Sequence, residues 1–220
     1  PSDTGLISAE ADKLARDTRA SMTEDEKIWQ LFYVTPELLT GVETATRAGD
    51  STKNALEEQP VGGIIYFAKN LENRAQTQEM LHNTKAYTKI PLSLGTDEEG
   101  GTVTRASRNP NLFSEPFKSP QKLNYIGGIE EILRDTDTRS RELRALGINV
   151  NFAPVCDVST DPKDFIYDRT LGQDANMTAD YVRLVVPAMT EGGTLPVLKH
   201  FPGYGNNVDT HTGIAVDLRP

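Results

Sequence analysis

Five short apolar segments, separated by stretches with helix signals, constrain the fold of this chain more than any other feature of its sequence. They cover residues 28–34, 61–67, 90–94, 148–158 and 195–198. Segments that are apolar on both faces are typical of parallel strands buried between helices. Strands that alternate with helices predict a parallel sheet with right-handed crossovers. The sequence therefore indicates an α/β fold, and both a barrel and a doubly wound sheet fit the pattern.

Helix signals lie between these segments. Ser8 and Asn73 are expected N-caps, and Thr23 with Glu26 has the spacing of a capping box. Helices are predicted over residues 9–22, 51–58, 128–146 and 177–191, with another beginning after Asn73. Pro187 is expected to kink the last of these helices.

Composition and charge argue against several function classes. The chain has 220 residues, of which 37% are hydrophobic and 25% are charged, as expected for a single domain over residues 1–220. A net charge of −9 disfavours nucleic acid and anionic membrane surfaces as partners. No apolar run approaches the roughly 18 residues of a membrane-spanning helix, and no Gly-rich nucleotide-binding motif is present. The single cysteine, Cys156, excludes an internal disulfide.

Polar side chains follow the predicted strands at the points where they end. Asp97 follows the third strand, Asp157 stands at the end of the fourth, and residues 199–200 follow the fifth. In a parallel barrel these strand ends converge on one rim, where substrate sits. Each charge alone is most simply a solvated loop residue, but repetition at matching positions favours a site. Five residues would together provide donors and acceptors for sugar hydroxyls: Asp97, Arg105, Arg169, Lys199 and His200.

Residues 199–211 are the stretch richest in chemically reactive side chains. The stretch places two histidines, a lysine and an aspartate among glycines, a proline and asparagines, directly after an apolar strand. In an extended loop, residues two apart point the same way, so the Asp209 carboxylate can reach the His211 imidazole. A carboxylate on one ring nitrogen fixes the tautomer and makes the other nitrogen a better proton carrier. A surface His–Asp pair is the ordinary alternative.

Four motifs resemble those of glycoside hydrolase family 3 and together span nearly the whole chain. Residues 97–105 resemble the family's D-x-E-G-G-x-V-x-R signature, and residues 152–157 resemble its A-P-V-x-D strand. Residues 199–203 match its K-H-F-P-G, and residues 22–31 resemble its M-T-x-x-E-K-x-x-Q-L segment. The triplet Asp209-Thr210-His211 resembles the acid/base segment of the family's β-N-acetylhexosaminidase branch, in which a His backed by an Asp is the general acid/base.

The resemblance implies a TIM barrel and a retaining mechanism through a covalent glycosyl-enzyme. The substrate-binding residues for a terminal β-linked N-acetylglucosamine would be Asp97, Arg105, Arg169, Lys199 and His200. His211 would be the catalytic acid/base, with Asp209 orienting it, and no cofactor or metal is expected. Peptidoglycan fragments are favoured over chitin oligosaccharides as the glycan, while the acceptor, water or phosphate, stays open.

Two features depart from the family pattern. Many relatives carry a second His where this chain has Tyr204, whose ring is expected to pack the turn instead. The family's nucleophile is an Asp in a later T/S-D motif that these residues lack, and Asp217 does not match it. About five to six of the eight βα units of a barrel are present. We therefore expect residues 1–220 to be the N-terminal portion of a catalytic barrel, inactive in hydrolysis alone and able to self-associate through an open sheet edge.

Two other functions fit parts of the sequence. A metal-dependent barrel hydrolase would use His200, Asp209 and His211 as ligands, but the first strand lacks the H-x-H that such enzymes usually carry. A non-catalytic N-acetylglucosamine-binding protein would keep the sugar-binding residues without a nucleophile. The remaining histidine, His82, lies in a predicted helix and is expected to be an ordinary surface or packing residue.

Overall fold

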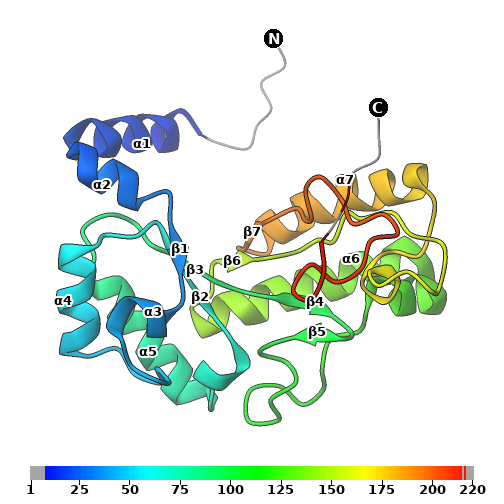
Figure 1. The fold of residues 1–220 in the computed structure, drawn as a ribbon, viewed down its shortest axis with the longest axis horizontal. Helices are drawn as coiled ribbons and strands as arrows, with labels where there is room; N and C mark the ends of the chain where they lie inside the picture. The colour runs from blue at the N-terminus through cyan, green and yellow to red at the C-terminus, as the bar shows by residue number, and fades with distance from the viewer. Residues whose placement is uncertain (1–7, 215, 217–220) are drawn as a thin grey trace.

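The computed structural model describes residues 8–214 and residue 216, and its centre is a five-stranded parallel sheet (Figure 1). The strands are β1 (Tyr33–Val34), β2 (Gly63–Tyr66), β3 (Ser93–Thr96), β6 (Val150–Asn151) and β7 (Leu195–Pro196). Their order in the sheet is their order in the chain. A doubly wound sheet reverses strand order at a switch point, whereas a barrel wall does not. The sheet is therefore a partial barrel, which confirms the predicted α/β barrel class.

The helices carry the caps that the sequence predicts. They are α1 (Ala9–Ser21), α2 (Glu24–Trp29), α3 (Pro36–Thr40), α4 (Asp50–Glu58), α5 (Arg74–Ala86), α6 (Pro120–Leu146) and α7 (Ala175–Glu191), with short 3₁₀ turns η1 (Ala68–Asn70) and η2 (Tyr167–Arg169). Ser8 caps α1 and Asn73 caps α5, and Thr23 with Glu26 closes the predicted capping box of α2. None of these helices, in the part of the chain that is described, has the length and apolar character needed to cross a membrane.

The strands are shorter than the apolar segments that predict them. The first strand keeps only residues 33–34 because the start of its apolar run, Ile28, belongs to α2. The third begins at Ser93, after Pro91, whose missing N–H cannot join a strand ladder. Pro154 interrupts the fourth segment in the same way, as predicted, and leaves β6 with two residues.

Two helices and one hairpin differ from the prediction. The helix α3 occupies a segment for which no helix was predicted. The helix α6 begins at Pro120 and is broken at Gly127 and Gly128, so the predicted helix over 128–146 is its second part. An antiparallel hairpin of β4 (Glu98–Gly100) and β5 (Val103–Thr104) follows β3 almost directly and was not predicted.

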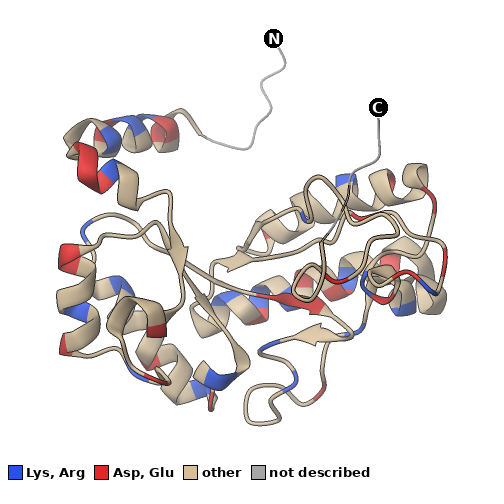
Figure 2. Ribbon diagram, viewed as in Figure 1, with Lys and Arg blue, Asp and Glu red and all other residues tan. Residues whose placement is uncertain are grey.

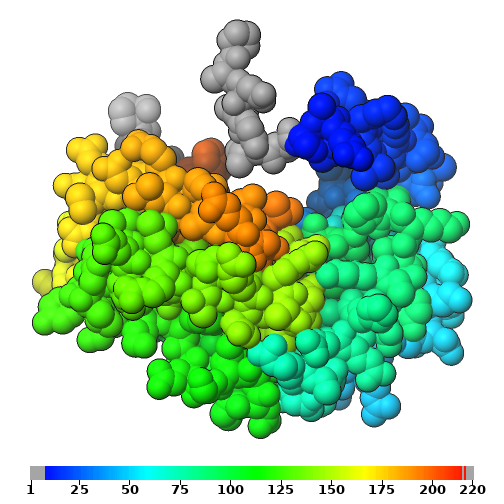
Figure 3. Space-filling model, turned by 180° about the vertical axis from the view of Figure 1, so that it is seen from behind, coloured from blue at the N-terminus to red at the C-terminus, as the bar shows by residue number. Residues whose placement is uncertain are grey.

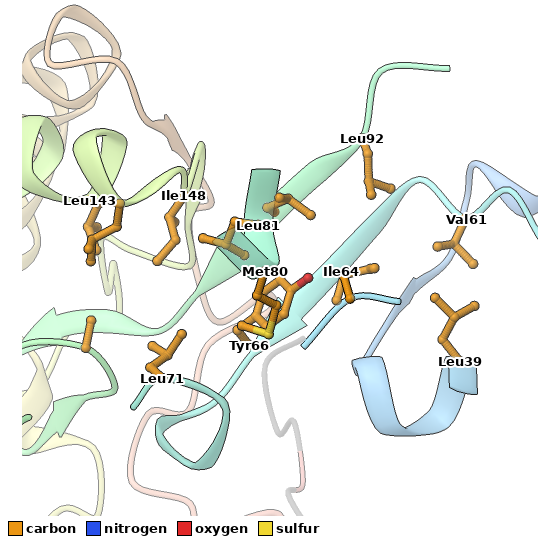
Figure 4. Packing of buried hydrophobic residues seen from close by; sticks show 14 of the residues in the cluster. Leu39, Val61, Ile64, Tyr66, Leu71, Met80, Leu81, Leu92, Leu143 and Ile148 are labelled. Carbon is orange, nitrogen blue, oxygen red and sulfur yellow. The ribbon is translucent and has the colours of Figure 1, made fainter. Parts of the chain in front are cut away.

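The main hydrophobic core packs the sheet against α5 and α6. Ile64 and Tyr66 of β2 form one cluster with Leu81 of α5 and Leu143 of α6, and all four are almost fully buried (Figure 4). A second cluster joins α6 to α7, which lie side by side on the back of the molecule (Figure 3). Because these contacts fix the strands, the loops after the carboxyl ends of the strands start from fixed positions.

A buried carboxylate holds the hairpin in shape. Glu98 of β4 is fully buried, in the acidic strand coloured red in Figure 2. Its Oε2 accepts backbone N–H groups of residues 105, 106 and 107 at 3.0, 2.7 and 3.3 Å, and its Oε1 accepts the Ser107 hydroxyl. These amides have no backbone acceptor, so the carboxylate accepts their hydrogen bonds instead. This interaction fixes the segment that carries Arg105.

One buried polar group left without a partner costs about 1–3 kcal/mol of stability. We expect Glu98→Ala to lower the free energy of unfolding by more than this, because several amides lose their acceptor. Glu98→Gln should cost less, since an amide oxygen still accepts hydrogen bonds. Urea denaturation measures both, with the exposed Glu115→Ala as the control. Equal stability of Glu98→Ala and Glu115→Ala would contradict this role.

Candidate functional site

A cluster of two carboxylates and two cations, built around the buried Glu99, lies at the carboxyl ends of the strands. Lys199 Nζ lies 2.8 Å from Asp97 Oδ1 and 2.6 Å from Glu99 Oε1. Arg169 binds Glu99 through two parallel hydrogen bonds, from Nε to Oε2 at 2.9 Å and from Nη2 to Oε1 at 2.8 Å. The Glu99 side chain is only 2% exposed, whereas Asp97 is 16% exposed and therefore reachable from solvent. Glu99 thus holds the two cations in place, and Asp97 presents an oxygen at the surface of the cluster.

The glycines of the D-x-E-G-G motif allow the chain to turn beside this cluster. Gly100 has a φ of +91°, and a Cβ there would lie 2.2 Å from the Lys118 carbonyl oxygen. Any other residue would combine an unfavourable backbone conformation with a clash against main chain. The motif therefore needs glycine at this position to keep Glu99 directed at Arg169.

His200 extends the cluster and has a defined tautomer. Its Nε2 lies 3.0 Å from Arg169 Nη2, and its Nδ1 lies 2.7 Å from Asp157 Oδ2. Because a guanidinium can only donate, Nε2 must accept, so the ring proton sits on Nδ1 and is donated to Asp157. His200 is therefore a neutral ring that links Arg169 to Asp157.

Asp157 is the buried anchor of the turn that follows β7. Its Oδ2 also accepts the His200 amide at 3.0 Å, and its Oδ1 accepts the Tyr204 amide at 2.6 Å. Burial alone would raise the pKa of Asp157, but the hydrogen bonds from His200 and Tyr204 outweigh it and hold the pKa below its ordinary value. Asp157 is therefore a charged carboxylate at neutral pH.

Arg105 lies at the edge of the cluster. Its Nε is 3.9 Å from Asp97 Oδ2, and its guanidinium stacks over the Phe67 ring at 5.6 Å from the centroid. The structure thus brings together all five residues predicted to bind sugar: Asp97, Arg105, Arg169, Lys199 and His200. They come from three successive strand ends and from the β4–β5 hairpin.

Sequence reasoning omitted Glu99 and Asp157 from the candidate site residues. Asp157 follows a predicted strand just as Asp97 does, so its position in the chain was a usable signal. Glu99 lies two residues after Asp97, inside the quoted motif, but nothing in the sequence indicates that it is more buried than its neighbours. Glu99 binds Arg169 and Lys199, and Asp157 binds His200, so both carboxylates hold predicted residues in place.

Asp209 and His211 are paired, but for a different reason from the one predicted. Asp209 Oδ1 accepts both the His211 amide, at 3.0 Å, and His211 Nδ1, at 2.7 Å. The segment is a turn, closed by a Gly213 amide donating to the Asp209 carbonyl at 2.9 Å, and not an extended loop. The hydrogen bonds from the His211 backbone and side chain hold the pKa of Asp209 below its ordinary value.

The pair is not bonded directly to the ion cluster. The His211 side chain is 85% exposed. Within residues 8–214, neither Asp209 nor His211 forms a hydrogen bond or ion pair with the predicted sugar-binding residues. The metal-hydrolase alternative gains no support, because both His200 ring nitrogens are already engaged by Asp157 and Arg169. The described residues also contain no group of three or more potential metal ligands.

We expect Glu99→Gln to lower the free energy of unfolding by about 3–5 kcal/mol, because it leaves Arg169 and Lys199 without a buried counter-charge. Chemical denaturation at neutral pH measures this loss. The exposed Glu191→Gln is the matched control and should change stability by less than about 0.5 kcal/mol. A Glu99→Gln protein as stable as this control would show that the ion cluster contributes nothing.

Asp157→Asn should produce a pH-dependent loss of stability. Because the folded-state pKa of Asp157 is depressed, its contribution is present above the ordinary pKa of 3.8 and is lost as pH falls through the folded pKa. The stability difference between wild type and variant should therefore be largest near neutral pH and shrink below about pH 4. Urea denaturation across pH 3–7 tests this, with the exposed Asp180→Asn as control; a pH-independent difference would contradict it.

Comparisons with known proteins agree on one family. The model of the glycosyl hydrolase family 3 N-terminal domain matches residues 23–220. A β-hexosaminidase of Xylella fastidiosa (strain 9a5c) is 32% identical over 195 residues, which cover 83% of this chain and 55% of the relative. The chain thus spans about half the length of this curated relative.

Similar solved structures belong to the same family. A glycoside hydrolase family 3 β-N-acetylglucosaminidase from Paenibacillus sp. str. FPU-7 aligns with a TM-score of 0.76 and 30% identity, over 87% of this chain and 35% of that chain. NagZ from Neisseria gonorrhoeae, solved with N-trifluoroacetyl-D-glucosamine, aligns with a TM-score of 0.70 and 26% identity, over 85% of this chain and 54% of that chain. With three of its four motifs gathered at one rim of a partial barrel, the chain belongs to glycosyl hydrolase family 3, and residues 23–220 match the N-terminal domain of that family.

Proposed function

We propose that this chain supplies the sugar-binding cluster and the acid/base residue of a retaining β-N-acetylhexosaminidase. The substrate would be a terminal β-linked N-acetylglucosamine, with peptidoglycan fragments as its natural source. The observation that carries the proposal is the ion cluster around the buried Glu99, which leaves Asp97, Arg169 and Lys199 partly open to solvent at the rim. The name of the similar Paenibacillus enzyme, a β-N-acetylglucosaminidase, and the glucosamine derivative bound to NagZ support the same sugar.

The cluster suits a ring of sugar hydroxyls. The partly exposed Asp97 carboxylate would accept hydrogen bonds from hydroxyls, while Lys199 and Arg169 would donate to their oxygens. Charge-assisted hydrogen bonds are short and strong, and here Glu99 already holds both cations in place. Binding the sugar would therefore require little reorganisation of the protein.

The chemistry would proceed in two steps through His211. In the first, a nucleophilic carboxylate attacks the anomeric carbon as the glycosidic bond breaks, and protonated His211 gives its proton to the leaving oxygen. In the second, His211 takes a proton from water, whose oxygen bonds to the anomeric carbon and releases the carboxylate. Asp209 would hold Nδ1, so that Nε2 faces the reaction and the charged ring is stabilised.

We place the nucleophile in a segment outside these residues, so that residues 1–220 form the N-terminal portion of the catalytic barrel. The sequence carries no T/S-D motif after Lys199-His200-Phe201-Pro202-Gly203. An open sheet edge would then be covered by the rest of the barrel or by a second copy of the chain. A sugar-binding protein without catalysis is the second candidate, because the cluster is complete while His211 is exposed and separate from it.

We expect His211→Ala, in an enzyme that joins this chain to the segment supplying the nucleophile, to lower kcat by about 10²–10⁴-fold on substrates with poor leaving groups. Substrates with acidic leaving groups need no proton, so 2,4-dinitrophenyl N-acetyl-β-D-glucosaminide should show a much smaller loss in the first step. Steady-state kinetics over a series of aryl N-acetyl-β-D-glucosaminides measures the difference. The exposed His82→Ala is the control.

Two outcomes would change the proposal. Hydrolysis by residues 1–220 alone would refute an external nucleophile. N-Acetylglucosamine binding without hydrolysis, in the joined enzyme as well as in the chain alone, would favour the sugar-binding protein.

A further inference from the structure

The turn that carries Asp209 and His211 is held to the barrel through a buried aromatic residue, Tyr204. The Tyr204 side chain is 8% exposed and packs with Val155 and Ile166. Its ring meets the His200 ring edge-on, with the centroids 5.1 Å apart. Packing therefore fixes the ring, and with it the position of the hydroxyl.

The Tyr204 hydroxyl lies 2.8 Å from Thr210 Oγ1. Thr210 is the residue between Asp209 and His211 in the chain, so this hydrogen bond holds the backbone that carries both members of the dyad. The other hydrogen bonds of segment 208–214 join the segment to itself, as when the Gly213 amide donates to the Asp209 carbonyl. As far as the described residues go, the hydroxyl pair is the only hydrogen bond that leaves segment 208–214 itself. The residues that flank the segment are joined separately, because the Val216 amide donates to Asn207 Oδ1 at 2.9 Å and Asn207 Nδ2 donates to the Val216 carbonyl at 3.4 Å.

The other end of Tyr204 is tied to the sugar-binding cluster. Its amide donates to Asp157 Oδ1 at 2.6 Å, and the second oxygen of the same carboxylate accepts His200 Nδ1 at 2.7 Å. Hydrogen bonds thus link Arg169, His200, Asp157 and the Tyr204 backbone, and the hydroxyl at the far end of the same tyrosine bonds Thr210 of the turn. The linked residues are buried or half-buried until Thr210 is reached.

We propose that Tyr204 is a positioning residue that sets where the acid/base turn sits relative to the sugar-binding cluster, through the hydrogen bond between its hydroxyl and Thr210. The inference rests on the proposed function, because it takes His211 to be the proton donor. Without the hydroxyl pair the turn keeps its internal hydrogen bonds, and the Asp209–His211 pair itself survives. What is lost is the fixed placement of the pair over the bound sugar, which a proton transfer requires.

The test removes the hydroxyl and keeps the ring. In the enzyme that joins this chain to the nucleophile segment, Tyr204→Phe and Thr210→Val should each lower kcat by about 3–10-fold on poor leaving groups, the effect of one neutral hydrogen bond. KM and N-acetylglucosamine binding should stay unchanged. The double variant should be no worse than either single variant, and Thr210→Ser should retain more activity than Thr210→Val. The matched control is Tyr125→Phe, on the exposed surface of α6.

A second measurement does not depend on activity. In amide-detected NMR spectra of residues 1–220, Tyr204→Phe and Thr210→Val should shift the His211 amide signal and reduce its protection from exchange, whereas Tyr125→Phe should not. Unchanged His211 signals, or losses in kcat that add in the double variant, would overturn the inference. If the signals shift while His211→Ala keeps full activity, the tether stands and the proposed acid/base role fails.

Discussion

The buried Glu99 carboxylate is the interaction on which the rest of the site depends. It receives two hydrogen bonds from Arg169 and an ion pair from Lys199, in a place almost closed to solvent. Two cations at such a depth are tolerated only with a counter-charge and well-formed hydrogen bonds. Because the three residues are far apart in the chain, their pairing also fixes three separate loops relative to one another.

The order of the strands explains why these loops meet. The strands β3, β6 and β7 are neighbours in the sheet, although about fifty residues separate each from the next in the chain. Asp97 follows β3, Arg169 lies beyond β6, and Lys199 follows β7, so one side of the rim carries the cluster. The strands β1 and β2 are farther along the sheet, and Phe67, directly after β2, stacks on Arg105. The parallel topology therefore concentrates charge on one part of the rim.

Sequence patterns were reliable where a single local interaction decides the structure. The caps at Ser8, Thr23 and Asn73 formed as predicted, because a cap needs only residues within one helical turn. Strand lengths were less well predicted, since pairing depends on neighbours that the local sequence does not name. The Asp209–His211 contact was predicted correctly from the wrong backbone conformation: a turn brings the two groups together as well as an extended strand would.

The sequence by itself determined the α/β class, the strand ends that carry charge and the family motifs, because hydrophobic period and motif spacing are local properties of the chain. Only the tertiary structure decided which of those charges are buried and what each one pairs with. Burial is a property of all the packed elements together, so Glu99 and Asp157 became distinguishable from solvated carboxylates only when the sheet and its loops closed around them. The same holds for Tyr204, whose ring packs against Val155 and Ile166 and whose hydroxyl lies next to Thr210 Oγ1.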